Sequence, residues 1–388
     1  MTRRYKILSV IAVLSVLMMS CLALALTHDS ACRAPPPLAA NAPAMKAMVY
    51  RCYGSPEVVK LETLEKPRPA PGRMLIKVAA ASVNPLDWHY LKGEPYLMRA
   101  VVGMGSPNDI RLGVDFAGTV EAVGENVTQF KPGDAVFGGA DGSFGEYVTV
   151  RAAGSVAPKP ASLTFEQAAA VPIAGVTALQ ALRDYGKVRP GQRVLINGAS
   201  GGVGTFAVQI AKILGANVTG VCSARNAAMV RAIGADRVID YTHEDFTRLP
   251  ERYDLIIDNV GNHSQSEYRR VLTPSGAVVA VGGVNCGACL GPLLTWLGDA
   301  VVSPLHRQKR ISMLAELNQD DLETLGAWLG ARKMTSVIDR AYALSAVPAA
   351  LGYLEQGHAR GKVVIRVQAS GAGASPAPEL VLSAARPE

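Results

Sequence analysis

Four glycines, Gly198, Gly201, Gly202 and Gly204, lie close together in a pattern typical of a loop that binds phosphate groups. The apolar run 193–197 before them has the length of a short strand, and apolar side chains recur at helical spacing after them. Glycines permit a tight turn and the close approach of a pyrophosphate, and the N-terminus of the following helix offers free N–H groups. The segment therefore predicts a dinucleotide site; a structural turn without a ligand is the alternative.

The next apolar run, 218–222, ends where dinucleotide-binding proteins contact the ribose of the cofactor. An acidic residue there would bond the 2′-hydroxyl of NADH, but the chain continues as Ser223-Ala-Arg225-Asn226, without a carboxylate. A guanidinium pairs well with a phosphate. The pattern favours NADPH over NADH, and a solvated Arg225 at the start of a helix is the alternative.

Further short apolar runs repeat along the chain at 237–240, 255–260 and 277–281. Such runs, separated by helical patterns, predict a doubly wound parallel sheet. Ligands bind to these sheets outside the carboxyl ends of the strands. We therefore expect the backbone of Asn259, Val260 and Gly282 near the nicotinamide.

Segments outside the glycine loop carry the pattern of a known family. They read MKAMVYRCYGSPEVVKLE, VAAASVNPLDWHYLKG, GVDFAGTVEAVGENVTQFKPGDAVFG, GSFGEYVTV and HARGKVVIRV. With Gly191, Gln209 and Lys212 around the loop, they make the chain from Met45 to Val367 resemble the quinone-oxidoreductase and zeta-crystallin branch of the medium-chain dehydrogenase/reductase superfamily. Within it, the chain is most similar to the reticulon-4-interacting oxidoreductases.

The resemblance implies an α/β fold in which a Rossmann doubly wound parallel sheet is inserted in a GroES-like, β-rich catalytic domain. The catalytic domain would comprise 45–171 and 311–367, the NADPH-binding domain 172–310, and a flexible tail 368–388. Short β-rich runs between Gly and Pro turns in 46–150 favour the first part independently. The family also implies a homodimer, with nicotinamide and substrate in the cleft between the two domains.

Zinc-dependent members of the superfamily place a cysteine, a histidine and a later cysteine around a catalytic metal. Here Asn84 stands in place of the first cysteine, Asp115 follows Val114 in place of His-Glu, and no cysteine occurs between Cys52 and Cys222. We therefore expect no zinc site.

Oxidation of an unactivated alcohol is hard without a Lewis acid, so hydride transfer from NADPH to a quinone or to an α,β-unsaturated carbonyl compound is the favoured activity. Alcohol and aldehyde interconversion without a metal is one alternative. A membrane-tethered NADPH-binding protein with little turnover is another.

Two residues are candidates for the catalytic site. Tyr96 lies near the place where related enoyl reductases carry a tyrosine proton donor, one position away from it, and packing is its alternative role. Asn84 borders the nicotinamide by the same resemblance, or forms a turn before Pro85.

The expected cofactor site combines the glycine loop, the ribose end and three positions taken from the resemblance alone. Those three are Thr177, Tyr241 and Lys362, for which core packing or an exposed strand edge is the alternative. The whole set is Thr177, Gly198, Ser200, Gly201, Gly202, Val203, Gly204, Ser223, Arg225, Tyr241, Asn259, Val260, Gly282 and Lys362.

The N-terminal residues 1–44 read as a membrane segment followed by a Pro-rich spacer. The run from Ile7 to Leu26 has no charge, and an α-helix needs ~20 such residues to cross a bilayer core. A cleaved signal peptide is the alternative. Positive charges before the run place the body outside the cytoplasm, whereas the supply of the cofactor favours the cytoplasm, so the side stays open.

The formal net charge of +7 arises in part from the N-terminal residues, and no basic stripe interleaved with aromatic residues appears, so we expect no nucleic-acid partner. Six cysteines are too few for a disulfide framework in a chain of 388 residues. Cys286 and Cys289 have CxxC spacing, but no second ligand pair follows, and their role stays open.

Overall fold

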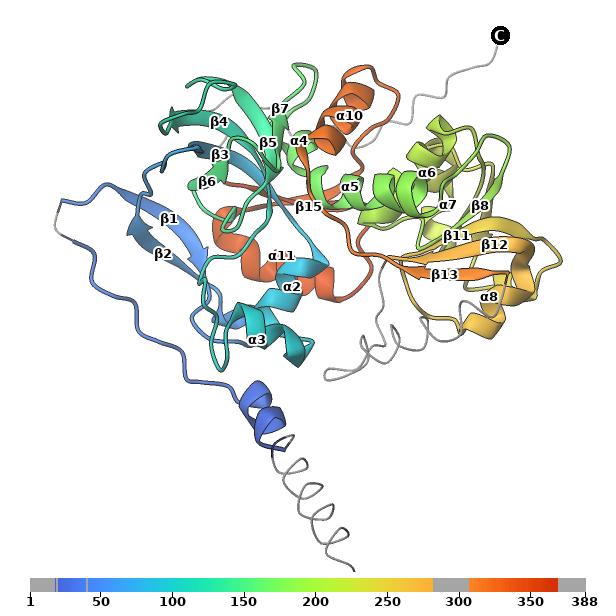
Figure 1. Ribbon diagram of the computed structural model, residues 1–388, viewed down its shortest axis with the longest axis horizontal. Helices are drawn as coiled ribbons and strands as arrows, with labels where there is room; N and C mark the ends of the chain where they lie inside the picture. Colours follow the sequence, from blue (N-terminus) through green and yellow to red (C-terminus); the bar gives the residue numbers. More distant parts are fainter. Residues whose placement is uncertain (1–17, 19, 40, 282–306, 369–388) are drawn as a thin grey trace, which may run out of the picture.

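The computed structural model describes residues 18, 20–39, 41–281 and 307–368. Two large sheets form the centres of two domains, and α5 (Pro172–Gln180) lies between them (Figure 1). The first belongs to the cofactor domain and the second to the catalytic domain. The predicted Rossmann and GroES-like arrangement is thus confirmed.

The cofactor domain holds an all-parallel sheet of six strands within the described residues. In spatial order the strands are β10 (Arg237–Asp240), β9 (Asn217–Cys222), β8 (Arg193–Asn197), β11 (Tyr253–Asp258), β12 (Leu272–Ala280) and β13 (Lys309–Ser312). Sequence order thus reverses between β8 and β11, which is the switch point where such sheets bind ligands. The helices of this domain are α6 (Gly202–Ile213), α7 (Ala224–Ala232) and α8 (Gln265–Val271), with short turns η3 (Ala181–Tyr185) and η4 (Phe246–Arg248).

Burial on both faces explains why the central strand has no polar alternation. Val194, Leu195 and Ile196 of β8 are all fully buried, as expected for a parallel strand covered by helices on both sides. On α6, Phe206 and Ile210 are one turn apart and fully buried in the same core cluster.

The catalytic domain has a sheet of seven strands within the described residues, with a separate hairpin of β1 (Ala44–Val49) and β2 (Lys60–Glu65). In order, the path is β14 (Ile338–Ala343), β15 (Lys362–Arg366), β3 (Arg73–Val83), β4 (Asp115–Val123), β5 (Ala135–Gly139) and β7 (Val156–Pro158), and β6 (Tyr147–Arg151) pairs with β3. Its helices and turns are η1 (Pro56–Val58), α2 (Pro85–Lys92), η2 (Tyr96–Met98), α3 (Arg99–Val102), α4 (Phe165–Ala169), α10 (Gln319–Gly330), η6 (Leu344–Ala346) and α11 (Val347–Glu355).

The two domains share a backbone contact at the glycine loop. Gly201 forms a parallel bridge with Gly361, and the Gly361 N–H donates to the Ser200 carbonyl at 2.8 Å. Gly361 directly precedes β15, so the last strand of the catalytic domain begins against the cofactor loop.

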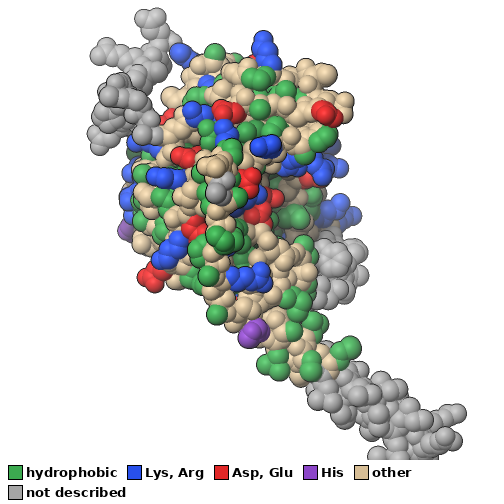
Figure 2. Space-filling view, turned by 90° about the vertical axis from the view of Figure 1, so that its left-hand side faces the viewer, with side chains coloured by type: hydrophobic (Ala, Val, Ile, Leu, Met, Phe, Trp, Pro, Cys, Tyr) green, Lys and Arg blue, Asp and Glu red, His purple; other side chains and the backbone are tan. Residues whose placement is uncertain are grey.

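The prediction of a membrane-anchored protein is contradicted. No helix among the described residues is long and apolar enough to cross a membrane. Most of the run 7–26 lies outside the described residues. Residues 20–27 form a short helix that projects from the body (Figure 1), and Figure 2 shows apolar side chains gathered on the part of the chain that projects from the body.

A disulfide joins Cys32, in the segment before the body, to Cys52, which is buried just after β1. The cysteine count had given no reason to expect this pairing. Cys286, Cys289 and Gly282 lie outside the described residues, as does the tail from 369 onward.

Candidate active site

The glycine loop has the geometry of a tight phosphate-binding turn. Gly198 has φ of +78°, which favours glycine, and a Cβ added to Gly204 would lie 2.1 Å from the Gly198 carbonyl oxygen. By contrast, a Cβ on Gly201 would meet nothing closer than 3.5 Å, so the loop is open at this position. No side chain caps the first turn of α6, so its N–H groups are available to an anion. A dinucleotide pyrophosphate fits this cradle.

Lys362 lies beside this loop and reaches the first residues of α2. Its side chain is 3.2 Å from where a Cβ of Gly202 would lie. Its ammonium donates to the Asn84 Oδ1 at 2.5 Å and to the Val83 carbonyl at 3.3 Å, and it lies 3.4 Å from the Asp115 Oδ2. The structure therefore brings together two predicted residues, Lys362 and Asn84, that are far apart in the sequence.

Asp115, at the start of β4, holds this cluster together. Its Oδ2 accepts hydrogen bonds from the Asn84 amide at 2.9 Å and from the Ser82 hydroxyl at 2.8 Å. Its Oδ1 accepts the N–H of Ile173 in the first turn of α5 at 3.0 Å, where the helix dipole favours a negative charge. Asp115 is fully buried and Lys362 is 3% exposed, so each charge depends on the other for compensation.

Asp87 is a second buried carboxyl group at this site. Asn84 is the N-cap of α2, and its backbone N–H donates to the Asp87 Oδ2 at 2.7 Å. The pKa of Asp87 is raised from 3.8 to about 7, mainly by burial and also by the Asp115 charge, while the Asn84 hydrogen bond and the Lys362 charge oppose the shift.

Tyr96 lies in η2, beyond the C-terminal end of α2, and is half-buried. Its ring is 4.7 Å from the Arg99 guanidinium. Within the described residues, no hydrogen bond joins Tyr96 to Lys362, Asn84 or Asp115. The two predicted catalytic residues therefore lie at opposite ends of α2.

The ribose end of the site contains the expected polar residues. Ser223 is the N-cap of α7; its side chain makes no capping bond to the helix backbone, and its hydroxyl accepts the Asn226 side-chain amide at 3.4 Å. Arg225 is exposed and donates to the His358 carbonyl at 3.2 Å. Tyr241 is 56% exposed, whereas Thr177 is buried on α5.

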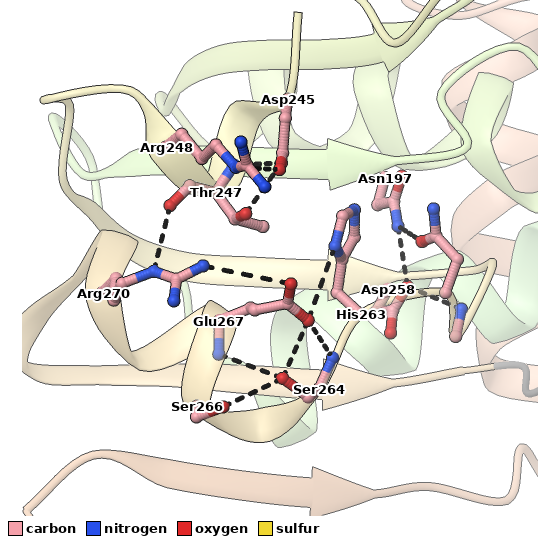
Figure 3. Close-up of polar contacts among 12 residues, drawn as sticks. Asn197, Asp245, Thr247, Arg248, Asp258, His263, Ser264, Ser266, Glu267 and Arg270 are labelled. Carbon is pink, nitrogen blue, oxygen red and sulfur yellow. Dashed lines mark hydrogen bonds and ion pairs between the residues drawn. The ribbon is translucent and has the colours of Figure 1, made fainter.

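A polar network fixes the loop after β11, as Figure 3 shows around Asn197 and Asp258. The Asp258 Oδ1 accepts from the Val260 and Gly261 N–H groups at 3.2 and 2.9 Å and from the Asn197 amide at 3.0 Å. The Asn259 amide donates to the Asn197 carbonyl at 2.9 Å. The backbone of 259–261 is thereby held at the carboxyl edge of the sheet.

Below this loop, Ser264 and Glu267 cap α8 reciprocally, and Arg270 reaches back to the carbonyl of Thr247 at 3.5 Å (Figure 3). The Ser264–Glu267 contacts stabilise the start of α8, and the Arg270 contact attaches its last turn to Thr247; neither contributes a ligand.

Sequence reasoning missed the positioning roles of Asp115, Ser82, Asn197 and Asp258. For Asn197 and Asp258 there was a signal, because each polar residue ends an apolar strand at the predicted carboxyl edge. Among the described residues, no group of three His, Cys, Asp or Glu side chains is placed to hold a metal ion.

A cavity of about 920 Å³ opens elsewhere, between α6 and the end of α10. Gln209, Lys212, Leu329 and Arg332 are among its lining residues, and no predicted site residue is. The cavity is therefore separate from the glycine loop.

In the part of the chain that the structure describes, a six-stranded parallel sheet with an open glycine loop, set against a β-rich domain, defines a two-domain dinucleotide-dependent oxidoreductase. Two family models match the chain, "Alcohol dehydrogenase GroES-like domain" over residues 70–161 and "Zinc-binding dehydrogenase" over residues 233–365.

Curated relatives are similar to this chain over most of its length. It is 34% identical over 372 residues to the mouse "NAD(P)H oxidoreductase RTN4IP1, mitochondrial", covering 84% of this chain and 90% of the relative. It is 35% identical over 321 residues to the "Trans-enoyl reductase pgmF" of Aspergillus terreus, covering 76% and 87%. The solved structure of the quinone oxidoreductase from Coxiella burnetii is similar with a TM-score of 0.74 and 33% identity, covering 84% and 100%.

The chain therefore belongs to the medium-chain dehydrogenase/reductase superfamily, in the quinone-oxidoreductase branch, and is an NAD(P)H-dependent oxidoreductase. The predicted family and enzyme class are confirmed.

Proposed function

We propose that the chain reduces quinones or α,β-unsaturated carbonyl compounds with NADPH and without zinc. The names of its relatives support the substrate class, because they include a trans-enoyl reductase and a quinone oxidoreductase. The observation that carries the proposal is the Lys362 ammonium between Asn84 and Asp115. By resemblance, Asn84 stands at the position of the first zinc-ligating cysteine, and Asp115 directly follows Val114, which stands at the position of the ligating histidine. Here the Asn84 and Asp115 side chains surround a cation that belongs to the chain.

An ammonium at this place supports zinc-independent chemistry on electrostatic grounds. A divalent ion bound by Asn84 and Asp115 would lie beside the Lys362 charge in a buried site, where like charges repel strongly. Both polar atoms of the Asn84 side chain are also already used, the oxygen by Lys362 and the nitrogen by Asp115. Asn84 therefore holds Lys362 in place, and we propose that it also borders the nicotinamide.

The binding roles follow from the arrangement of the elements. The glycine loop and the start of α6 would hold the pyrophosphate, and Ser223, Arg225 and Tyr241 would hold the 2′-phosphate. The fixed backbone of 259–261 would border the nicotinamide. When bound, NADPH supplies the hydride, and the protein supplies position and charge.

Proton delivery is assigned to Tyr96. Its hydroxyl would donate to the carbon or oxygen that becomes basic after reduction, and solvent would restore the proton. This role requires that the Tyr96 hydroxyl lies within hydrogen-bond distance of the bound acceptor.

The decisive experiment is oxidation of NADPH and of NADH by the full chain, followed at 340 nm with 1,4-benzoquinone, 2-cyclohexenone and crotonyl-coenzyme A. Turnover of one class with NADPH, insensitive to a zinc chelator, is expected. Turnover of only alcohols or aldehydes would establish the alternative activity. Tight NADPH binding without any turnover would indicate a binding protein instead.

We also propose a homodimer, on the basis of the family resemblance. Sedimentation velocity at micromolar concentration tests it, since a species of about 40.8 kDa, the mass of one chain, would contradict it.

A further inference from the structure

The segment Leu26–Arg33, here called the strap, lies against the loop Gly93–Ser106, which follows α2 and carries Tyr96. The Ser30 N–H donates to the Gly105 carbonyl at 2.8 Å. The Arg33 guanidinium donates to the Ser106 hydroxyl at 2.9 Å. The Cys32–Cys52 disulfide fixes the end of the strap covalently to the body. The strap is thus attached to the catalytic domain at several separate points.

Arg99 connects the strap to the loop. Its side chain is 2% exposed, and its guanidinium donates to the Gly93 carbonyl of the loop at 2.9 Å and to the Lys92 carbonyl at the end of α2 at 3.0 Å. The guanidinium also donates to two carbonyls of the strap, that of Leu26 at 3.0 Å and that of His28 at 3.3 Å.

The charge of Arg99 is also compensated from the strap. Among the described residues, its ion pair is with Asp29, at 2.8 Å. A buried guanidinium without a charged partner is costly, so the strap stabilises Arg99 in this position. The Arg99 side chain therefore depends on a segment outside the catalytic domain proper.

Arg99 in turn contacts Tyr96. Its guanidinium lies 4.7 Å from the Tyr96 ring and 4.3 Å from the Tyr53 ring. Tyr53 is adjacent to the disulfide residue Cys52, and its hydroxyl donates to the Gly103 carbonyl at 2.6 Å. One contiguous set of contacts thus runs from the disulfide through Tyr53 and Arg99 to Tyr96.

We propose that the strap is a redox-controlled latch: while the Cys32–Cys52 disulfide is intact, the strap holds Arg99, and Arg99 acts as a positioning residue that orders the loop Gly93–Ser106 and Tyr96. The proposal deepens the proposed function, on which its kinetic part rests.

The release step is a thiol–disulfide exchange with a thiol or dithiol reductant. A thiolate attacks the Sγ of Cys32, which is exposed, the S–S bond breaks, and the Cys52 sulfur leaves and takes up a proton. A second thiolate then attacks the reductant sulfur of the mixed disulfide, the bond to Cys32 breaks, and the released Cys32 thiolate takes up a proton. The two electrons come from two thiol groups, which end as a disulfide of the reductant.

After reduction, only non-covalent contacts hold the strap. Asp29 is 60% exposed, so solvent screens its ion pair with Arg99, and this pair is a weaker attachment than the covalent bond that has been broken. The strap then leaves the loop part of the time, water reaches the Arg99 guanidinium, and the position of Tyr96 is less well defined.

Hydrogen exchange of the full chain tests the structural part. The oxidised and dithiothreitol-reduced proteins are compared, together with Cys32→Ser and with Cys21→Ser, whose cysteine is exposed and free. We expect faster exchange at 93–106 in the reduced wild type and in Cys32→Ser, and no change in Cys21→Ser or when reductant is added to Cys32→Ser. Equal exchange at 93–106 in oxidised and reduced wild type would overturn the latch.

Steady-state kinetics of the same proteins tests the positioning role. Reduction and Cys32→Ser are expected to lower kcat/KM for the acceptor by about ten-fold or more, because a small misplacement of a catalytic group can cost about a hundred-fold. The KM for NADPH is expected to stay constant, since the glycine loop does not touch the strap. Faster exchange with an unchanged kcat/KM would refute the positioning role.

The two proposals fail in different ways. If the oxidised wild type turns over no acceptor, the proposed function fails, and the exchange comparison alone then decides whether the latch exists. Asp29→Asn, which keeps the disulfide but removes the ion pair, is expected to give a smaller change in the same direction.

Discussion

Asp87→Asn should remove a pH-dependent loss of stability from the protein. In the folded state burial raises the pKa of Asp87 from 3.8 to about 7. Below about pH 4 both the folded and the unfolded chain carry the proton on this group, so it contributes no difference. As the pH rises, the unfolded chain releases this proton first, and the folded state loses stability until the pH reaches about 7.

The magnitude follows from the size of the shift. Each pKa unit corresponds to about 1.4 kcal/mol, so a shift of about three units gives an upper limit of about 4 kcal/mol between pH 4 and pH 7. Asparagine has no proton to lose, and its side-chain oxygen can still accept the N–H of Asn84 at the start of α2.

Urea unfolding at pH 4, 5, 6, 7 and 8 measures this effect. The free energy of unfolding of the wild type minus that of Asp87→Asn should fall steadily from pH 4 to 7 and then stay level. Asp134→Asn is the matched control, because Asp134 accepts the N–H of Lys131 with the same spacing at the surface. A wild-type minus Asp87→Asn difference that does not change between pH 4 and 7 would refute the reasoning.

Three further changes test the cofactor loop, the ribose end and the buried ion pair. Gly204→Val should abolish NADPH binding in a fluorescence titration, because its side chain would overlap the loop backbone, whereas Gly352→Ala, which has open space on α11, should bind normally and raise stability by about 1 kcal/mol. Arg225→Ala should raise the KM for NADPH by about ten-fold and leave that for NADH unchanged, since a charge-assisted bond contributes about 1.5–3 kcal/mol; equal effects on both cofactors would contradict a 2′-phosphate contact. Lys362→Met should lower the free energy of unfolding by about 3–5 kcal/mol, because Asp115 is then buried without its partner, and adding Asp115→Asn should recover part of the loss; no recovery in urea unfolding would show that the loss is not electrostatic.

The cofactor domain could be predicted from the sequence because its signals are local. The apolar run at 193–197 is buried on both faces, and the glycines after it require a tight turn, so strand, loop and helix were all visible in one short stretch. The regular spacing of short apolar runs from Val218 onward similarly predicted the parallel sheet.

The buried charge cluster could not be predicted in the same way. Lys362 and Asp115 are 247 positions apart, and nothing near either residue indicates the other. Asn84 was expected at the site. Its hydrogen bonds to Lys362 and Asp115, which use both polar atoms of its side chain, arise because β3 pairs with β4 and with β15. Such contacts depend on the tertiary fold rather than on local pattern.

The N-terminal segment shows how a composition signal can mislead. The uncharged run before Thr27 suggested a membrane span, yet no described helix is long and apolar enough to cross a membrane, and the residues after it pack on the catalytic domain through Arg99. Hydrophobic content alone does not distinguish these outcomes, because the tertiary contacts of the segment are not encoded in its own composition.

The hydrogen bond from Gly361 to Ser200 also constrains how the molecule can move. Since it joins the catalytic domain to the cofactor loop, the two domains cannot slide apart at this point without breaking it. A rotation with its pivot at the pyrophosphate end would keep this bond intact, and the largest displacement would then fall at the nicotinamide end of the proposed site. The adenine half of the cofactor would then stay bound throughout the catalytic cycle, while the nicotinamide half would become exposed to solvent and buried again in each cycle.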